Sequence, residues 1–124
     1  MILGVNHVQV NVATSTDLIH WSPLEDGEGR LLAVMKPREG KFDSAQTEVG
    51  PPLILTDKGI VLIYNGKNAT NDHRDPALSP GVYTCGQALF DAKEPTKLLS
   101  RLDSPFFKPE LTWEKRGQYV GRTT

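Results

Sequence analysis

Three polar groups of different chemistry lie close to one predicted β-hairpin and define the first candidate site of this sequence. The carboxylate of Glu48 comes just before the hairpin, and the amide of Asn65 and the ammonium group of Lys67 come at its end. A carboxylate can act as an acid or a base, and amide and ammonium groups can bind hydroxyl groups or a phosphate. In a closed hairpin all three groups lie at the open end, which is an arrangement typical of a site.

The hairpin is predicted from two apolar runs, at 53–55 and 60–64, which flank a short turn that ends at Gly59. Glycine supplies the backbone conformation that a tight turn needs and that other residues resist. The two prolines at 51–52 cannot donate ladder hydrogen bonds, so the first strand begins after them or lies at a sheet edge.

The rest of the chain indicates more strands and no regular helix. Residues 7–13 alternate strictly, with Val8, Val10 and Val12 on one face of a half-buried strand. Residues 15–21 predict a turn in which the aspartate satisfies backbone donors and the tryptophan packs on the sheet. Further strands are predicted at 31–35, 81–90, 106–109 and 117–124, with a turn or one helical turn at 91–99 and a long loop at 68–80.

Composition bounds the class of protein. The 124 residues can form one small domain with a core, and a net charge of −1 gives no basic face for nucleic acid or acidic membranes. The single cysteine, Cys85, excludes an intramolecular disulfide, and the three histidines lack metal-ligand spacing. With no leader and no membrane-spanning run, we expect a soluble, cytoplasmic protein. The sequon at 68–70 receives little weight, because such short matches are common.

A loose internal repeat indicates a modular all-β fold. The dipeptide at 36–37 recurs at 108–109, an offset of 72 residues, and 48–50 resembles 119–121. Repeats of several strands are typical of propeller blades, and a propeller needs at least about 4 blades to close. The chain holds roughly 1.7 such repeats. It is therefore predicted to be an incomplete propeller.

Three segments of the sequence resemble motifs of glycoside hydrolase family 130 and together extend from about residue 8 to residue 121. Residues 48–52 and 56–66 are similar to the family motif E-x-G-P-P…T-D-x-G-W-L-x-I-Y-H-G. Residues 83–91 and 94–97 are similar to Y-x-x-G-A-A-L-L-D…D-P-S-K. Residues 13–21 are similar to the A-x-S-x-D-L-x-x-W turn of these and related propellers.

The resemblance implies a fold and an activity. The family's fold is a five-bladed β-propeller with a sugar site on its axis, and its members are mannoside phosphorylases and β-mannosidases. We therefore expect an all-β chain of antiparallel, blade-like sheets that holds fewer than two blades of a partial five-bladed β-propeller. Residues 1–47 would form the end of one blade and a link, 48–110 a full blade, and 111–124 the start of the next. The expected chemistry is cleavage of β-mannosidic or related glycosidic bonds by water or phosphate.

Under this resemblance Glu48 is the candidate catalytic carboxylate. Inverting hydrolysis needs two carboxyl groups about 6.5–9.5 Å apart. Asp43 lies five residues away, and an extended strand would place it on the opposite face and more than about 15 Å from Glu48 unless the chain bends. The phosphorylases' catalytic aspartate would belong to an earlier blade and the hydrolases' second glutamate to a later segment, so a complete acid/base pair is not expected.

Four secondary candidates for substrate contact are Asp43, Asn65, Lys67 and Tyr83, with Asn65 standing where the family has histidine. For each of these residues a role without substrate contact remains an alternative. Glu48 could be a solvated rim carboxylate or pair with Lys67, and Asn65 and Lys67 could be a plain polar strand end. Tyr83 could be a half-buried structural tyrosine.

The expected ligands and partners follow from the same resemblance. We expect a carbohydrate substrate, no metal and no organic cofactor, with inorganic phosphate required only by a phosphorylase. No nucleic-acid or membrane partner is expected. Unpaired strand edges invite pairing between copies, so we expect a homo-oligomer. The competing hypothesis is a catalytically incomplete fragment, or a carbohydrate-binding remnant without turnover, that folds as an oligomer or belongs to a longer protein.

Overall fold

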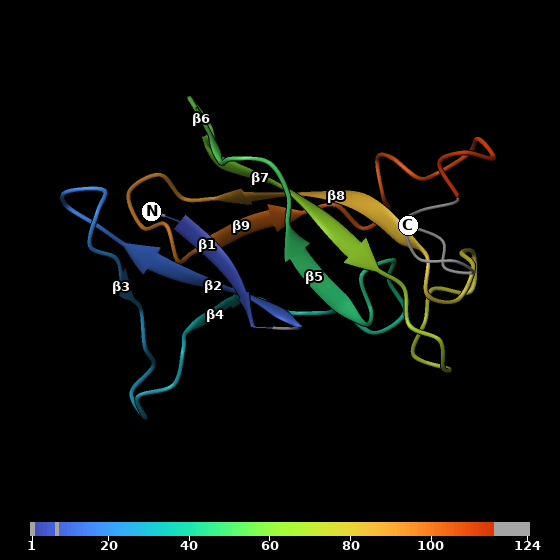
Figure 1. Cartoon of the computed structure of the whole chain (residues 1–124), viewed down its shortest axis with the longest axis horizontal. Coiled ribbons are helices and arrows are strands. Elements are labelled where there is room, and N and C mark those ends of the chain that lie inside the picture. The colour runs from blue at the N-terminus through green and yellow to red at the C-terminus, as the bar shows by residue number, and fades with distance from the viewer. Residues whose placement is uncertain (1, 7, 116–124) are drawn as a thin grey trace.

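The structure, a computed structural model, describes the backbone of residues 2–6 and the whole of residues 8–115. The described part contains nine β-strands and no α-helix, and therefore no helix long and apolar enough to cross a membrane. The strands form two antiparallel sheets that lie side by side (Figure 1). The all-β prediction is confirmed.

The first sheet is built around strand β2 (Gln9–Thr14), which pairs with all three other strands of the sheet. These are β1 (Ile2–Asn6), β3 (Ser22–Pro23) and β4 (Ala33–Met35). Val10 and Val12 of β2 are buried as the alternating pattern predicts, whereas Val8 comes before the strand and is exposed.

The second sheet has five strands in the order β5-β7-β8-β9, with β6 also paired to β7. These strands are β5 (Gln46–Val49), β6 (Ile54–Thr56), β7 (Gly59–Lys67), β8 (Tyr83–Phe90) and β9 (Leu98–Arg101). Strands β5 and β6 share one edge of β7 and are separated by the two prolines at 51–52. The first strand of the hairpin, β6, thus begins after the two prolines, as predicted.

The predicted hairpin joins β6 to β7. Thr56 pairs with Gly59 across the two-residue turn, and Gly59 has a φ of 137°, a value that side-chain-bearing residues rarely adopt. The Thr56 hydroxyl also donates to the carbonyl of Gly59 at 2.9 Å. The hairpin therefore forms where the sequence predicts it.

The hydrophobic core lies between the two sheets. Val10 and Met35 come from the first sheet, and they share one buried cluster with Phe42 of the connecting segment and with Leu62, Tyr64, Ala88 and Phe90 of the second sheet. Glycine at position 86 makes room for this packing, because a Cβ there would lie 2.6 Å from the ring of Phe42 and 2.6 Å from the Tyr64 hydroxyl. The core thus covers one face of the second sheet and leaves the other face free of it.

One buried side chain, that of Asn68, organises the loop between β7 and β8. Its amide nitrogen donates to the carbonyls of Asp75, Leu78 and Ser79 at 3.1, 3.3 and 3.1 Å. Its amide oxygen accepts from the Asp75 N–H at 2.9 Å and from the Ser44 hydroxyl at 3.1 Å. The long loop is confirmed, but it is fastened to the segment that leads into β5.

Several local predictions were wrong. Residues 98–101 form strand β9 instead of ending a turn or helical turn, and 106–109 contains a single bridge, between Phe107 and Cys85, instead of a strand. Trp21 is about one-third exposed, and its packing on the sheet stays a prediction, whereas Asp17 caps the turn as expected. The predicted strand at 117–124 lies outside the described residues, and the division into blades at 48 and 111 stays a prediction.

Candidate functional site

The pairing of β5, β7 and β8 brings four of the predicted site residues onto one face of the second sheet. Glu48 lies opposite Asn65, and Lys67 lies opposite Tyr83. Directly opposed residues project to the same face, as do residues two positions apart on one strand. We call this surface the Glu48 face and define it by Gln46, Glu48, Asn65, Lys67, Tyr83 and Cys85.

Contacts on the Glu48 face are polar and local. The Gln46 amide donates to a carboxylate oxygen of Glu48 at 2.5 Å, and the Lys67 ammonium lies 5.3 Å from the centre of the Tyr83 ring. No ion pair joins Glu48 to Lys67 among the residues described. The alternative that Glu48 is neutralised by Lys67 is therefore not supported.

Cys85 completes the row that begins with Glu48 and Asn65. Its thiol lies 3.9 Å from the Asn65 amide oxygen, and partial burial raises the pKa of the Cys85 thiol. A raised pKa keeps the sulfur protonated and unreactive near neutral pH. Its partial burial beside Asn65 favours a packing role for Cys85 on this face.

Asp43 lies apart from the other four candidates. Its side chain is fully buried and bonds to Arg38 at 2.9 Å, to Arg101 at 2.6 Å and to the Tyr64 hydroxyl at 2.7 Å. Tyr64 precedes Asn65 in β7 and so projects to the opposite face of the sheet. Substrate contact by Asp43 stays a prediction, and its surroundings favour a structural role.

The buried cluster around Asp43 joins the segment before β5 to the outer strand β9. Arg101 also donates to the carbonyl of Lys36 at 2.6 Å, and Arg38 donates to the carbonyl of Leu102 at 2.6 Å. Burial is the main cause of the raised pKa of the Tyr64 hydroxyl. Asp43 also raises this pKa, whereas Arg101 lowers it. The phenol therefore stays a hydrogen-bond donor to the carboxylate.

Glu48 is the sole aspartate or glutamate within the five strands of the second sheet. The described residues also contain no group of three or more histidine, cysteine or acidic side chains that could hold a metal ion. The Glu48 face thus offers one carboxylate, with amide, ammonium and phenol groups beside it. This set can donate or accept one proton and can hold several hydroxyl groups.

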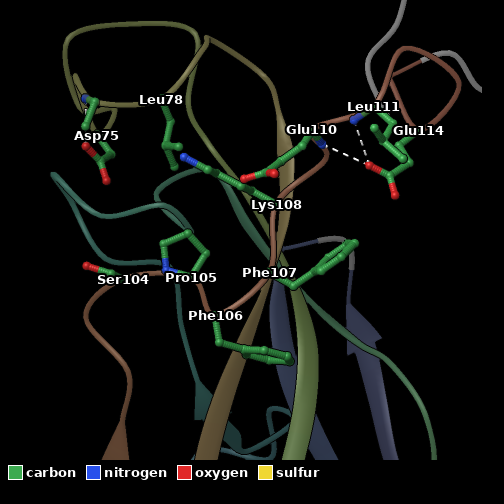
Figure 2. A pocket seen from close by; sticks show the side chains of 11 residues that line it. Asp75, Leu78, Ser104, Pro105, Phe106, Phe107, Lys108, Glu110, Leu111 and Glu114 are labelled. Carbon is green, nitrogen blue, oxygen red and sulfur yellow. Dashed lines mark hydrogen bonds between the residues drawn. The ribbon is translucent and has the colours of Figure 1, made fainter.

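Two adjoining clefts, which the sequence analysis missed, open beyond the outer edge of β8. They have volumes of about 680 and 400 Å³ and lie between the loop at 75–79 and the segment at 104–115. Figure 2 shows the residues that line the larger cleft. The larger cleft includes Leu78, Phe106 and Phe107. No local sequence motif predicts these clefts, because the two segments that line them are distant in sequence and approach each other only in the folded chain.

Sequence comparison decides the family. The sequence profile of glycoside hydrolase family 130, described as beta-1,4-mannooligosaccharide phosphorylase, matches residues 3–121. The chain belongs to glycoside hydrolase family 130. Its two antiparallel sheets are consequently blade-like parts of the β-propeller of this family, as the resemblance predicts.

Two relatives of this family 130 chain are much longer proteins. A 1,2-beta-oligomannan phosphorylase from Thermoanaerobacter sp. (strain X514) is 32% identical over 117 residues, which are 94% of this chain and 34% of that protein. A solved structure from Bacteroides thetaiotaomicron is 58% identical with a TM-score of 0.89, over 95% of this chain and 34% of that one. The chain thus spans about a third of the length of these relatives.

A further solved structure connects the family to hydrolysis. It was reported as showing that the family of mannoside phosphorylases contains glycoside hydrolases that target β-1,2 mannosidic linkages in Candida mannan. It is 51% identical with a TM-score of 0.86, over 93% of this chain and 32% of that one. Both reaction types, phosphorolysis and hydrolysis, therefore occur among the relatives.

Proposed function

We propose that this chain supplies the Glu48 part of a carbohydrate site that cleaves β-mannosidic linkages, with β-1,2 linkages as the first substrates to test. The observation that carries the proposal is the Glu48 face, where one carboxylate lies in register with Asn65 and beside Lys67 and Tyr83. The names of the relatives, phosphorylases and hydrolases of mannosides, support the same substrate class.

In this proposal each residue has a separate role. Glu48 exchanges a proton with the glycosidic oxygen or with the attacking water, and Gln46 orients its carboxylate through their hydrogen bond. Asn65, Lys67 and Tyr83 bind hydroxyl groups of the sugar. If the reaction is phosphorolysis, inorganic phosphate is the second substrate, and the Lys67 ammonium is the cation of this face that receives it.

A second candidate function is carbohydrate binding without turnover. Inverting hydrolysis uses two carboxyl groups about 6.5–9.5 Å apart. The strands of the second sheet carry one, that of Glu48, and this favours binding without turnover. In this case the open edge at β9 would pair between copies of the chain. A homo-oligomer and a cytoplasmic location both stay predictions.

The experiment that separates these functions uses Glu48→Gln, which keeps the size of the side chain and removes its proton exchange. Mannose or mannose 1-phosphate release from β-1,2-mannobiose is followed with and without phosphate, and binding is measured by calorimetry. We expect turnover to fall about 100-fold or more, the size of a lost general acid or base, with binding retained. Glu28→Gln, at an exposed position in a loop remote from this face, is the matched control.

Three outcomes distinguish the candidates. Loss of turnover in Glu48→Gln but not in Glu28→Gln supports the catalytic proposal. Binding of mannobiose by the unaltered chain with no turnover supports the carbohydrate-binding function. If the unaltered chain neither binds nor cleaves mannobiose, both candidates are wrong. Light scattering after size exclusion then shows whether the chain pairs its sheet edges.

A further inference from the structure

The sequence contains one Asn-Gly pair, Asn65-Gly66, and it lies within the Glu48 face. In such a pair the backbone nitrogen of the glycine can attack the side-chain carbonyl carbon of the asparagine, because glycine has no Cβ to obstruct the approach. Asn65 lies opposite Glu48 on one neighbouring strand and opposite Cys85 on the other. A reaction of Asn65 therefore changes the chemistry of this face.

Packing, and not backbone conformation, requires glycine at position 66. The φ of Gly66 lies outside the left-handed region, so other residues could adopt its backbone conformation. A Cβ at this position would, however, lie 2.7 Å from two ring carbons of Phe42 and 2.8 Å from the Cβ of Asp43. The segment before β5 thus packs directly on the back of β7. This packing imposes a glycine beside the asparagine of the candidate site.

The folded sheet holds this pair in a geometry that does not react. Gly66 lies between Thr47 of β5 and Thr84 of β8, so its N–H group points along the sheet to a neighbouring strand. The Asn65 amide oxygen lies 3.9 Å from the Cys85 sulfur, across the sheet. To attack, the glycine nitrogen must lose its proton, and the backbone must leave the extended conformation of β7. The reaction therefore requires β7 to open.

Opening of β7 is a rare event in the folded chain. The strand has partners along both edges, and its buried side chains Leu62 and Tyr64 belong to the hydrophobic core. Core strands open with free energies close to that of global unfolding. The folded chain should consequently react at a small fraction of the rate of the unfolded chain.

We propose that Asn65 is a self-modification site that the fold keeps inactive and that reacts when β7 leaves the sheet. The deprotonated Gly66 nitrogen forms a bond to the side-chain carbonyl carbon of Asn65, and the side-chain nitrogen leaves as ammonia. The product is a cyclic imide, which water opens at either of its two carbonyls. One opening gives aspartate, and the other gives isoaspartate, whose main chain runs through the former side-chain carbon. One water enters and one ammonia leaves, without an oxidant or a cofactor.

Both products disturb the Glu48 face. An aspartate in place of Asn65 puts a carboxylate directly opposite Glu48, and like charges in an opposed pair are destabilising. Isoaspartate adds one carbon atom to the main chain of β7, so Lys67 loses its register with Tyr83. A chain that carries isoaspartate therefore cannot rebuild this part of the sheet. The inference rests on the geometry of the face and does not depend on sugar binding.

The test compares the conversion of Asn65 in the folded and the unfolded chain. The chain is incubated in mildly alkaline buffer with and without concentrated urea, and its tryptic peptides are followed by chromatography and mass spectrometry. Trypsin releases residues 59–67 as one peptide, in which Asn65 is the sole asparagine. We expect conversion to be at least about 100-fold slower without urea, because a folded domain is open for less than this fraction of the time.

Two variants give matched controls. Asn65→Gln keeps an amide on a longer side chain that closes a ring more slowly, so position 65 should stay unconverted in urea over the same period. Gly66→Ala is studied only in urea, because its Cβ has no room in the folded chain. There the added methyl group should slow conversion several-fold by obstructing the attack.

A second measurement follows the product after urea is removed. Refolded molecules are separated from unfolded ones by size exclusion, and their 59–67 peptide is analysed. Isoaspartate should be absent from the refolded fraction and concentrated in the unfolded one. Aged Asn65→Gln should refold in full, which shows that incubation in urea does not itself prevent refolding.

Each part of the inference can fail separately. Equal conversion with and without urea overturns the protection by the fold. No conversion in urea, or equal conversion in Gly66→Ala, overturns the reaction. Isoaspartate that refolds as readily as the unmodified chain overturns the effect on the Glu48 face. None of these results depends on mannoside cleavage, so the proposed function is tested independently.

Discussion

Replacing Asp43 by asparagine should destabilise the chain more than any substitution on its surface. The change keeps the shape of a fully buried side chain and removes the charge that two arginines share. Arg38 retains Asp103 and the Leu102 carbonyl as partners. Arg101 loses its only ion pair within the described residues, and its side chain is just 7% exposed.

The expected loss of stability follows from the burial of the Arg101 charge. Removing one partner of a buried ion pair costs about 3 to 5 kcal/mol, because the remaining charge stays buried without compensation. We expect the lower end, about 3 kcal/mol, since Arg101 keeps its bonds to the Lys36 carbonyl and the Tyr64 hydroxyl. A small domain is stable by about 5 to 15 kcal/mol, so the variant should fold but only marginally.

Urea unfolding followed by fluorescence is the assay. With a denaturant slope of about 2 kcal/mol per molar, the midpoint should fall by roughly 1.5 M. Asp103→Asn is the control, because it removes another carboxylate partner of Arg38 at a side chain that is 75% exposed, where an ion pair contributes below about 1 kcal/mol. If the two variants lose equal stability, or if Asp43→Asn loses less than about 1 kcal/mol, the reasoning from buried charge is wrong.

Three further predictions test other parts of the structure. Gly86→Ala should cost about 1 to 3 kcal/mol in urea unfolding, because the new methyl group overlaps Phe42 and Tyr64, whereas Gly27→Ala, which meets nothing within 4 Å, should be neutral. Asn68→Ala should cost about 2 to 4 kcal/mol and raise hydrogen exchange across 69–80, because it removes the side-chain partner of backbone groups of Asp75 and Ser79; unchanged exchange there would contradict the role of Asn68. The hydrogen bond from His20, with those from the backbone N–H groups of His20 and Ile19, holds the pKa of Asp17 well below its usual range. The stability that these hydrogen bonds provide is present above the unfolded-state pKa of Asp17 and is lost as the pH falls through its folded-state pKa. An NMR titration in which Asp17 has the midpoint of an ordinary aspartate would refute this prediction.

The strands that the sequence predicts correctly are those with a strong local signal. The alternation of β2, the apolar run of β7 and the glycine at its turn all act within a few residues. Strand β9 has no such signal, because leucine, serine and arginine suit several structures, and only pairing with β8 makes them a strand. Phe107 forms a single bridge for the same reason: its partner, Cys85, is distant in sequence.

The candidate site divides in the same way. Glu48 and Asn65 are opposite each other on neighbouring strands, and this pairing could be anticipated from the sequence because it follows from the register of the predicted hairpin. The burial of Asp43 could not, since its partner Arg101 is 58 residues away and both charges would ordinarily be placed at the surface. The clefts require the 75–79 loop to approach the 104–115 segment, which no local pattern specifies.

The hydrogen bonds of Asn68 have a consequence for producing this chain in a eukaryotic secretory host. The sequon at 68–70 is recognised on extended, accessible polypeptide, but the amide nitrogen that would carry the glycan is fully buried and donates to three carbonyls. Glycosylation and folding therefore compete for the same atom. A chain modified during translocation cannot close the β7–β8 loop, and a chain that folds first is protected. Replacing the exposed Thr70 by alanine abolishes the sequon, leaves the buried amide in place, and lets secreted material fold without this competition.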